Sequence, residues 1–228
     1  MSTDIFEQVR DALFESLYMV SAAWAIASLI GVPLGVFLAT SRKGELLAAR
    51  RLNACLNLIV NATGSTPFII LVVALIPVTR FIVGTSIGAT AAIVPLSIAG
   101  APYIARVVEG AIREVDHGLI EASLAMGGTP LQIVRKVLLP EALPGIALGL
   151  TLVAVALIAY SAMVGAVGGG GLGDLGIRYG YQRFRVDVMA IVIMILIALV
   201  QIVQMAGAAI ARMVNKRVRP ASGRSGRA

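Results

Sequence analysis

The sequence predicts an all-α, polytopic membrane protein with five transmembrane helices. Hydrophobic residues make up 58% of the 228-residue chain, charged residues only 14%, and mean hydropathy is +0.92, values too apolar for an ordinary soluble domain. Five stretches contain no Asp, Glu, Lys or Arg, and the shortest has 24 residues. As a helix it measures about 36 Å, enough to cross a hydrocarbon core of about 30 Å. The stretches are Ser16–Ser41, Leu52–Thr79, Phe81–Ala105, Ala142–Gly173 and Val188–Ala211.

These stretches place the expected elements along the chain. The predicted spans are about 16–41, 54–79, 86–105, 144–167 and 188–211. Residues 1–15 form a periplasmic amphipathic segment, residues 106–143 a cytoplasmic loop, and residues 212–228 a basic cytoplasmic tail whose composition predicts disorder. Pro33, Pro67, Pro95 and Pro102 fall within or near the spans, so some of these helices should be kinked or broken. Five buried helices of a large soluble core are the less favoured alternative.

The basic residues predict the orientation. Fourteen of the 19 lie on one side of the predicted spans and five on the other, whereas the 12 acidic residues divide equally. The positive-inside rule therefore places the N-terminus outside and the C-terminus in the cytoplasm. The fourteen are Arg42, Lys43, Arg50, Arg51, Arg106, Arg113, Arg135, Lys136, Arg212, Lys216, Arg217, Arg219, Arg224 and Arg227, and the five are Arg10, Arg80, Arg178, Arg183 and Arg185.

The first residues and the cysteine count exclude other readings. Residues 1–15 are acidic, unlike a cleaved signal peptide, so the first span should be retained. A lone Cys55 precludes an internal disulfide and suits a small packing residue. His117 is the single histidine, and no Cys/His cluster indicates a metal site.

The cytoplasmic loop has the pattern of two short helices joined by a tight turn. Asp116 is a suitable N-cap for the first helix, and Gly127-Gly128 should end it. Thr129-Pro130-Leu131-Gln132 has the residues of a capping box with proline at the first helical position. Pro140 and Pro144 should then break the second helix and restart the chain as the fourth span.

The same loop carries a sequence signature. Glu121-Ala122-Ser123 is followed by Gly127 and, after a spacing of eleven residues, by Leu139-Pro140. This resembles the cytoplasmic loop of ABC-importer permeases, E-A-A-x3-G-x9-I-x-L-P, with Ser123 in place of alanine and Val137 in place of isoleucine. The resemblance implies a type I importer permease fold in which Glu121, Ala122, Ser123, Gly127, Leu139 and Pro140 couple the chain to a separate ATPase.

The likeness extends over most of the chain from the second span onward. Within the importer permeases it is most similar to the membrane subunits of methionine importers. The runs that carry this similarity are Ser65–Ile70, Ile76–Arg80, Ile82–Gly88, Gly118–Ala122, Gln132–Gly145, Tyr160–Met163, Gly168–Gly173 and Tyr179–Tyr181. The similarity implies a pathway for L- or D-methionine in a bacterial inner membrane. It also implies an assembly with a second copy of the chain, two ATPase subunits that bind ATP and Mg, and an external substrate-binding lipoprotein.

Three residues of the fourth span are candidates for the transport pathway. The hydroxyls of Tyr160 and Ser161 could hydrogen-bond a zwitterionic amino acid, and the thioether of Met163 is a soft partner for its side chain. Ordinary packing is the alternative for all three. The small-residue pairs Gly31…Gly35 and Gly145…Gly149 allow close helix approach, either between two copies or within one chain.

The sequence also bears on the energy source. No G-x4-G-K-[ST] phosphate loop is present, so the chain is expected not to be an enzyme and to hold no cofactor, with ATP hydrolysis left to a partner. The run Gly168–Gly173 lacks the following Lys-Ser/Thr and suits a tight turn or close packing instead.

Other functions remain as alternatives. They are a permease for another small amino acid or solute, a secondary transporter or channel, an intramembrane hydrolase and a scaffold module. Secondary transporters usually keep an acidic residue or histidine within the membrane, and the predicted spans contain none. The basic tail follows directly on a span, so membrane topology and anionic lipid explain it better than nucleic acid.

Overall fold

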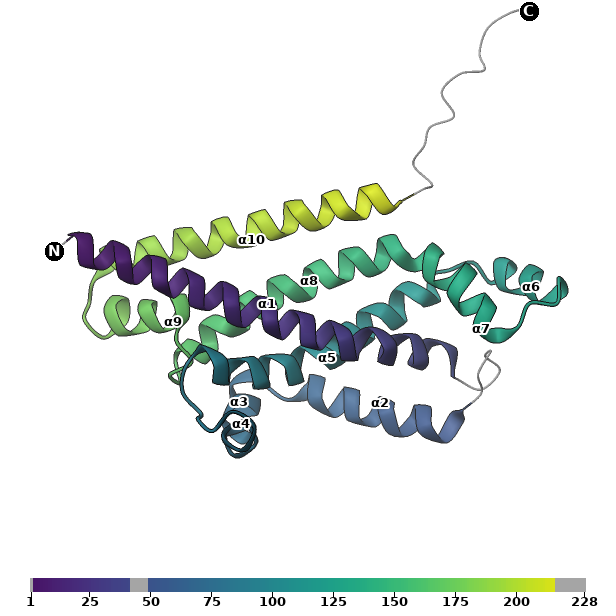
Figure 1. The fold of residues 1–228 in the computed structure, drawn as a ribbon, viewed down its shortest axis with the longest axis horizontal. Helices are drawn as coiled ribbons and strands as arrows, with labels where there is room; N and C mark the ends of the chain where they lie inside the picture. The colour runs from purple at the N-terminus through teal and green to yellow at the C-terminus, as the bar shows by residue number, and fades with distance from the viewer. Residues whose placement is uncertain (1, 42–48, 216–228) are drawn as a thin grey trace, which may run out of the picture.

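The computed structural model describes residues 2–41 and 49–215, and in these ranges it contains helices and connecting segments without a strand. The all-α class predicted from the sequence is confirmed (Figure 1). The helices are α1 (Ser2–Thr40), α2 (Arg50–Ser65), α3 (Phe68–Ala74), α4 (Ile76–Val83), α5 (Ala89–Arg113), α6 (His117–Ala125), α7 (Pro130–Ile133), the π-helical turn η1 (Val134–Leu138), α8 (Leu139–Gly165), α9 (Gly171–Leu175), the π-helical turn η2 (Gly176–Tyr181) and α10 (Val186–Val214).

The long helices run lengthwise in one bundle. By length and hydropathy, four helical segments of the described residues suffice to cross a membrane, and the bent pair α2–α3 makes a fifth. The N-terminus, α9 and the start of α10 lie at one end of the bundle (Figure 1). α6 and α7 protrude from the opposite end, toward which the last turns of α10 point. With the bent pair counted as one span the number of crossings is odd, which agrees with the position of the start of α1 and the end of α10 toward opposite ends of the bundle.

The first span and the segment before it form one helix. Of the amphipathic segment expected for residues 1–15, the described residues from Ser2 onward are the start of α1, which runs to Thr40. Val9 and Ala12 in its first turns are buried in an apolar cluster with Leu172 and Val188, from α9 and α10. The charged residues between them did not end the helix because its apolar face is covered by these distant segments.

The second span is broken. α2 and α3 meet at an angle of 106°, and the junction residue Thr66 is extended with ψ 126°. Pro67 accounts for the break because the residue before a proline disfavours helical geometry. The predicted proline effect is confirmed here, whereas α1, α5 and α8 continue through Pro33, Pro95, Pro102 and Pro144.

The helix of the third span is longer than the predicted span. α5 continues eight residues past the expected end at Ala105, so the first residues of the predicted cytoplasmic segment 106–143 are helical. The last two turns carry Arg106, Glu109 and Arg113 at helical spacings of three and four, where opposite charges stabilise a helix. These charged residues, which were assigned to a loop from the sequence, are part of a helix in the structure.

α5 lies at the centre of the bundle, between α1 and α8. At Gly31 and Gly35 of α1, an added Cβ would lie 2.6 and 2.5 Å from backbone oxygens of α5. At Gly149 of α8 it would lie 1.7 Å from a methyl carbon of Val107 on α5. Of the two interpretations left open for these small-residue pairs, the structure therefore supports packing within one chain.

The glycine run at the outer end forms a tight turn, as expected. Gly168, Gly170 and Gly171 have φ values between 74° and 85°, which favour glycine. The Gly171 backbone N–H donates to Glu15 Oε2, and the next N–H along the chain donates to Ser16 Oγ, both at 2.8 Å. These two bonds attach the turn to the side of α1.

The basic tail is described only at its beginning. α10 extends to Val214, so Arg212 lies on the helix and not in a separate tail. The disorder predicted for the tail concerns residues 216–228, which lie outside the described residues.

Candidate coupling hairpin and transport cavity

The first half of the signature loop is a capped helix, α6. The Gly118 backbone N–H donates to Asp116 Oδ1 at 2.7 Å, which confirms the predicted N-cap. At the other end Gly127 has φ 79°, its N–H donates to the carbonyl of Leu124 at 2.9 Å, and the Gly128 N–H donates to that of Ser123 at 3.0 Å. This pair of bonds is a Schellman motif, so the turn has one defined geometry.

The second half differs from the predicted short, interrupted helix. Thr129 N–H donates to Gln132 Oε1 at 3.0 Å, as the capping-box pattern predicts. α7 then leads through η1 into α8 without a break, so Pro140 and Pro144 do not restart the chain. Pro140 follows η1 at the second residue of α8, where a missing N–H is tolerated, whereas Pro144 lies inside the continuous α8.

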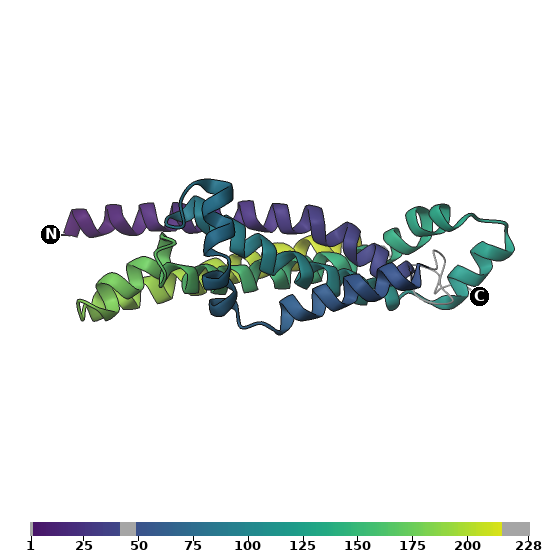
Figure 2. The same ribbon diagram turned by 90° about the horizontal axis from the view of Figure 1, so that it is seen from below.

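We call α6, the glycine turn, α7 and η1 (residues 117–138) the coupling hairpin. Its base is buried: Ile133, Val134 and Leu138 belong to the main apolar core with Ile112 and Val115. Its tip is apolar and exposed, with Met126 82% accessible. Figure 2 shows the coupling hairpin extending beyond the rest of the bundle. A buried base and an exposed apolar tip are the features of a rigid docking element.

Four of the six predicted coupling residues lie in this hairpin, and two follow it at the start of α8. Glu121, Ala122 and Gly127 are exposed on α6 and its turn. The Ser123 hydroxyl donates to the carbonyl of Leu119, one turn earlier, at 2.6 Å. The remaining two, Leu139 and Pro140, lie at the start of α8, half-buried and exposed respectively. The signature therefore includes exposed residues of α6 and its turn, and the junction that joins the hairpin to a membrane span.

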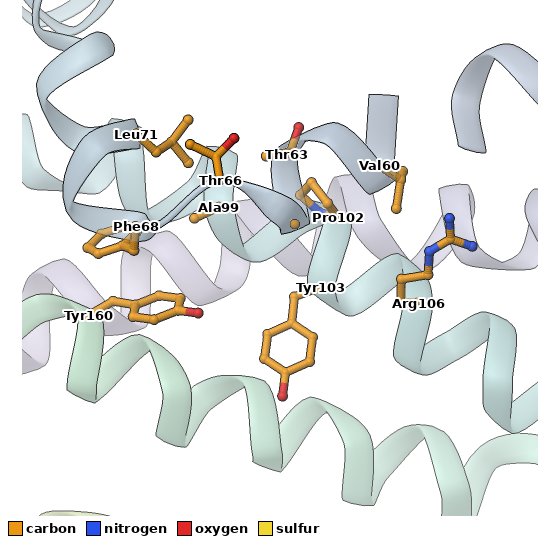
Figure 3. A pocket seen from close by; sticks show the side chains of 11 residues that line it. Val60, Thr63, Thr66, Phe68, Leu71, Ala99, Pro102, Tyr103, Arg106 and Tyr160 are labelled. Atoms are coloured by element: carbon orange, nitrogen blue, oxygen red, sulfur yellow. The ribbon is translucent and has the colours of Figure 1, made fainter. Parts of the chain in front are cut away.

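A cavity of about 230 Å³ lies at the break between α2 and α3 (Figure 3). The rings of Phe68 and Tyr160 stack at one side of it, with centroids 4.3 Å apart and an interplanar angle of 10°. The cavity is lined by Val60, Thr63, Gly64, Thr66, Phe68, Leu71, Ala99, Pro102, Tyr103, Arg106 and Tyr160.

The three predicted pathway residues do not share this cavity. Tyr160 lines it, as just described. Ser161 is buried. Its hydroxyl donates to the carbonyl of Ile158 in the same helix at 2.7 Å. Met163 is 47% exposed and is not among the lining residues.

The sequence reasoning missed a polar network beside the cavity. Glu109 is almost completely buried and accepts hydrogen bonds from Arg106 at 2.5 Å and Arg113 at 2.6 Å. Arg106 also donates to Asn61 Oδ1 on α2 at 2.6 Å. The signal in the sequence was the spacing Arg-x2-Glu-x3-Arg, which predicts ion pairs once the helix is known to continue. Among the described residues, no group of three His, Cys, Asp or Glu is placed to hold a metal ion.

The bundle, the broken span and the protruding hairpin define a transporter membrane subunit, and comparison gives its family. The chain belongs to the family described as "Binding-protein-dependent transport system inner membrane component", which matches residues 31–220. It is an inner-membrane transport component of the ABC type I permease fold.

Individual relatives are more specific. The chain is 53% identical over 206 residues to the "Probable D-methionine transport system permease protein MetI" of Vibrio cholerae, covering 90% of this chain and 92% of the relative. It is 46% identical over 217 residues to the protein of the same description from Pasteurella multocida, covering 95% and 100%. A chain of the solved "MetNI methionine ABC transporter" in inward-facing conformations superposes with a TM-score of 0.92 at 49% identity, covering 95% and 100%.

Proposed function

We propose that this chain is the permease subunit of an ABC importer and forms the membrane pathway for methionine, as either enantiomer. The observation that carries the proposal is the 53% identity, across nearly the full length of both chains, to a relative named for D-methionine transport. The superposition on a chain of a methionine ABC transporter, with a TM-score of 0.92, agrees with it.

The proposed assembly contains two copies of this chain, two ATPase subunits that bind ATP and Mg, and an external substrate-binding lipoprotein. The matched family is named for its dependence on a binding protein, and the superposed chain comes from an ABC transporter. The permease itself hydrolyses nothing in this scheme. Closure of the ATPases on ATP favours an outward-facing pathway, and hydrolysis restores the inward-facing one, because each ligand shifts the equilibrium through its differential affinity for the two states.

In this proposal the coupling hairpin is the ATPase contact. Its exposed tip offers Met126 and the carboxylate of Glu121 to a partner, while its buried base moves with the core. Because η1 continues directly into α8, a displacement of the tip is transmitted to a span that lines the cavity through Tyr160. Met163 on the same span remains a proposed pathway residue.

The proposal is tested by reconstitution. The chain is coexpressed with its ATPase, purified, placed in proteoliposomes with the binding protein outside, and assayed for uptake of labelled L- and D-methionine. We expect uptake that requires ATP, Mg and all components. Uptake by the permease alone on an ion gradient would instead identify a secondary transporter, and ATP-driven uptake of another solute without methionine would reassign the substrate.

A further inference from the structure

We propose that the cavity at the α2–α3 break is a substrate site within the bundle, in which Arg106 binds the carboxylate of a zwitterionic amino acid during its passage. This inference rests on the proposed function and adds a place and a chemical role to it. Four observations carry it: the position of the cavity, the charge beside it, the unused polar groups within it and its aromatic side.

The cavity exists because a span is broken. The 106° bend at Thr66-Pro67 moves α3 away from the axis of α2 and leaves space against α5 and α8. Interrupted membrane helices commonly form substrate sites, since irregular backbone within a membrane is tolerated where it lines a cavity. Arg106 lies seven residues before the end of α5, about 10 Å along the axis. Tyr160, also in the lining, lies five residues before the end of α8 at Gly165, so the cavity lies near the middle of the bundle and Arg106 lines its side nearer the coupling hairpin.

The charge beside the cavity is positive. Two guanidinium groups, those of Arg106 and Arg113, share the single carboxylate of Glu109, so the three side chains together carry one excess positive charge. Of these three, only Arg106 lines the cavity. Its side chain remains 32% exposed, against 4% for that of Glu109. Its guanidinium has five N–H donors, and three of them are used by Glu109, Asn61 Oδ1 and the Asn57 carbonyl, so a carboxylate can bind without displacing these partners.

Two phenol groups in the cavity are available as well. Neither the Tyr103 nor the Tyr160 hydroxyl makes a hydrogen bond within the part of the chain that is described. Figure 3 shows Tyr103 between the Phe68–Tyr160 pair and Arg106. A phenol both donates and accepts, so it suits the carboxylate or the ammonium group of an amino acid.

The opposite side of the cavity is apolar. The stacked rings of Phe68 and Tyr160 offer aromatic surface across from the guanidinium. Thioether sulfur interacts favourably with aromatic rings, so the side chain of methionine suits this side while its carboxylate faces Arg106. The arrangement selects for a small zwitterion with an apolar side chain and against cationic solutes.

The test measures protection of a cysteine placed in the cavity. The variant Thr66→Cys, in a Cys55→Ala background and assembled with the ATPase, is labelled with a small maleimide in the presence of millimolar L-methionine or L-methioninamide, which lacks the carboxylate. We expect methionine to slow labelling and methioninamide not to. In Arg106→Gln the methionine concentration for half-protection should rise about tenfold or more, the value of one lost charge-assisted hydrogen bond.

Three controls separate binding from folding. Arg113→Gln removes the other partner of Glu109 with the same charge change but does not line the cavity, so protection should persist. Arg106→Lys keeps the cation and should restore part of the protection. A cysteine at Phe184, near the start of α10, should be labelled at the same rate with or without methionine.

Two results would overturn the inference: equal protection in the parent variant and Arg106→Gln, or no difference between methionine and methioninamide. Uptake distinguishes this failure from that of the proposed function. The proposed function fails if the unaltered assembly imports no methionine. The inference alone fails if the unaltered assembly imports methionine and Arg106→Gln imports it equally fast.

Discussion

At the scale of single residues, Gly127 determines the turn of the coupling hairpin. Its backbone has φ 79°, a conformation that is about 1–2 kcal/mol less favourable for a residue with a Cβ and least favourable for a β-branched residue. Gly127→Val should therefore reduce the population with the correct turn about 5–30-fold and lower ATP-driven uptake, while membrane insertion is unchanged. Gly127→Asn, which tolerates this conformation, is the matched control. Equal activity of the valine variant and the parent would contradict the role of the turn.

Glu121 tests the surface beside that turn. The residue is exposed, and the structure records no ion pair for it in the described ranges, so Glu121→Lys should change unfolding free energy by less than about 0.5 kcal/mol. Its expected effect is on the partner: the ATPase should dissociate or lose coupling. Copurification and uptake measure this, with Glu121→Gln as the neutral, isosteric comparison. Unchanged uptake in the lysine variant would count against contact at this position.

At the scale of elements, stability depends on how closely α1 approaches α5. A Cβ at Gly35 would lie 2.5 Å from the Ala105 carbonyl oxygen, a backbone atom that cannot rotate away. Gly35→Leu should therefore cost at least about 1–3 kcal/mol and lower the thermal midpoint of the purified assembly. Gly110→Leu on α5 is matched in size, and among the described residues no atom outside its own stretch of helix lies within 4 Å of its added Cβ. An equal loss in both variants would show that close packing is not the cause.

Elements were predictable where their signals are local. The Asp116 cap, the glycine turn and the Thr129–Gln132 pairing follow from neighbouring residues, and the structure confirms them. The end of α5 was not predictable from charge alone, because Glu109 is stable in its buried position only between two arginines. The sequence predicted that some of the prolines would kink or break a helix. It did not indicate that Pro67 breaks its span while α1, α5 and α8 continue through their prolines.

At the scale of the whole molecule, the bundle predicts opposite accessibility for its two ends. The coupling hairpin and the start of α10 lie at opposite ends in both views (Figures 1 and 2). In a Cys55→Ala background, Phe184→Cys should react with a membrane-impermeant maleimide added to intact spheroplasts. Met126→Cys should react only after permeabilisation or in inverted vesicles. Both native side chains are more than 80% exposed, which makes access the deciding factor. Labelling of both from the same side would contradict the orientation.

The amino-acid sequence was sufficient to predict the membrane class, the segments long and apolar enough to cross a membrane, and the capped turn of the coupling hairpin. These features depend on hydropathy, charge and interactions between residues a few positions apart, all of which are visible in the sequence. The tertiary structure decided where α1 begins, that Ser161 bonds its own helix, and that Arg106 meets Asn61 and the aromatic pair at a cavity. Each of these features depends on which distant segments pack against a side chain. Such contacts between distant segments form only when the chain folds.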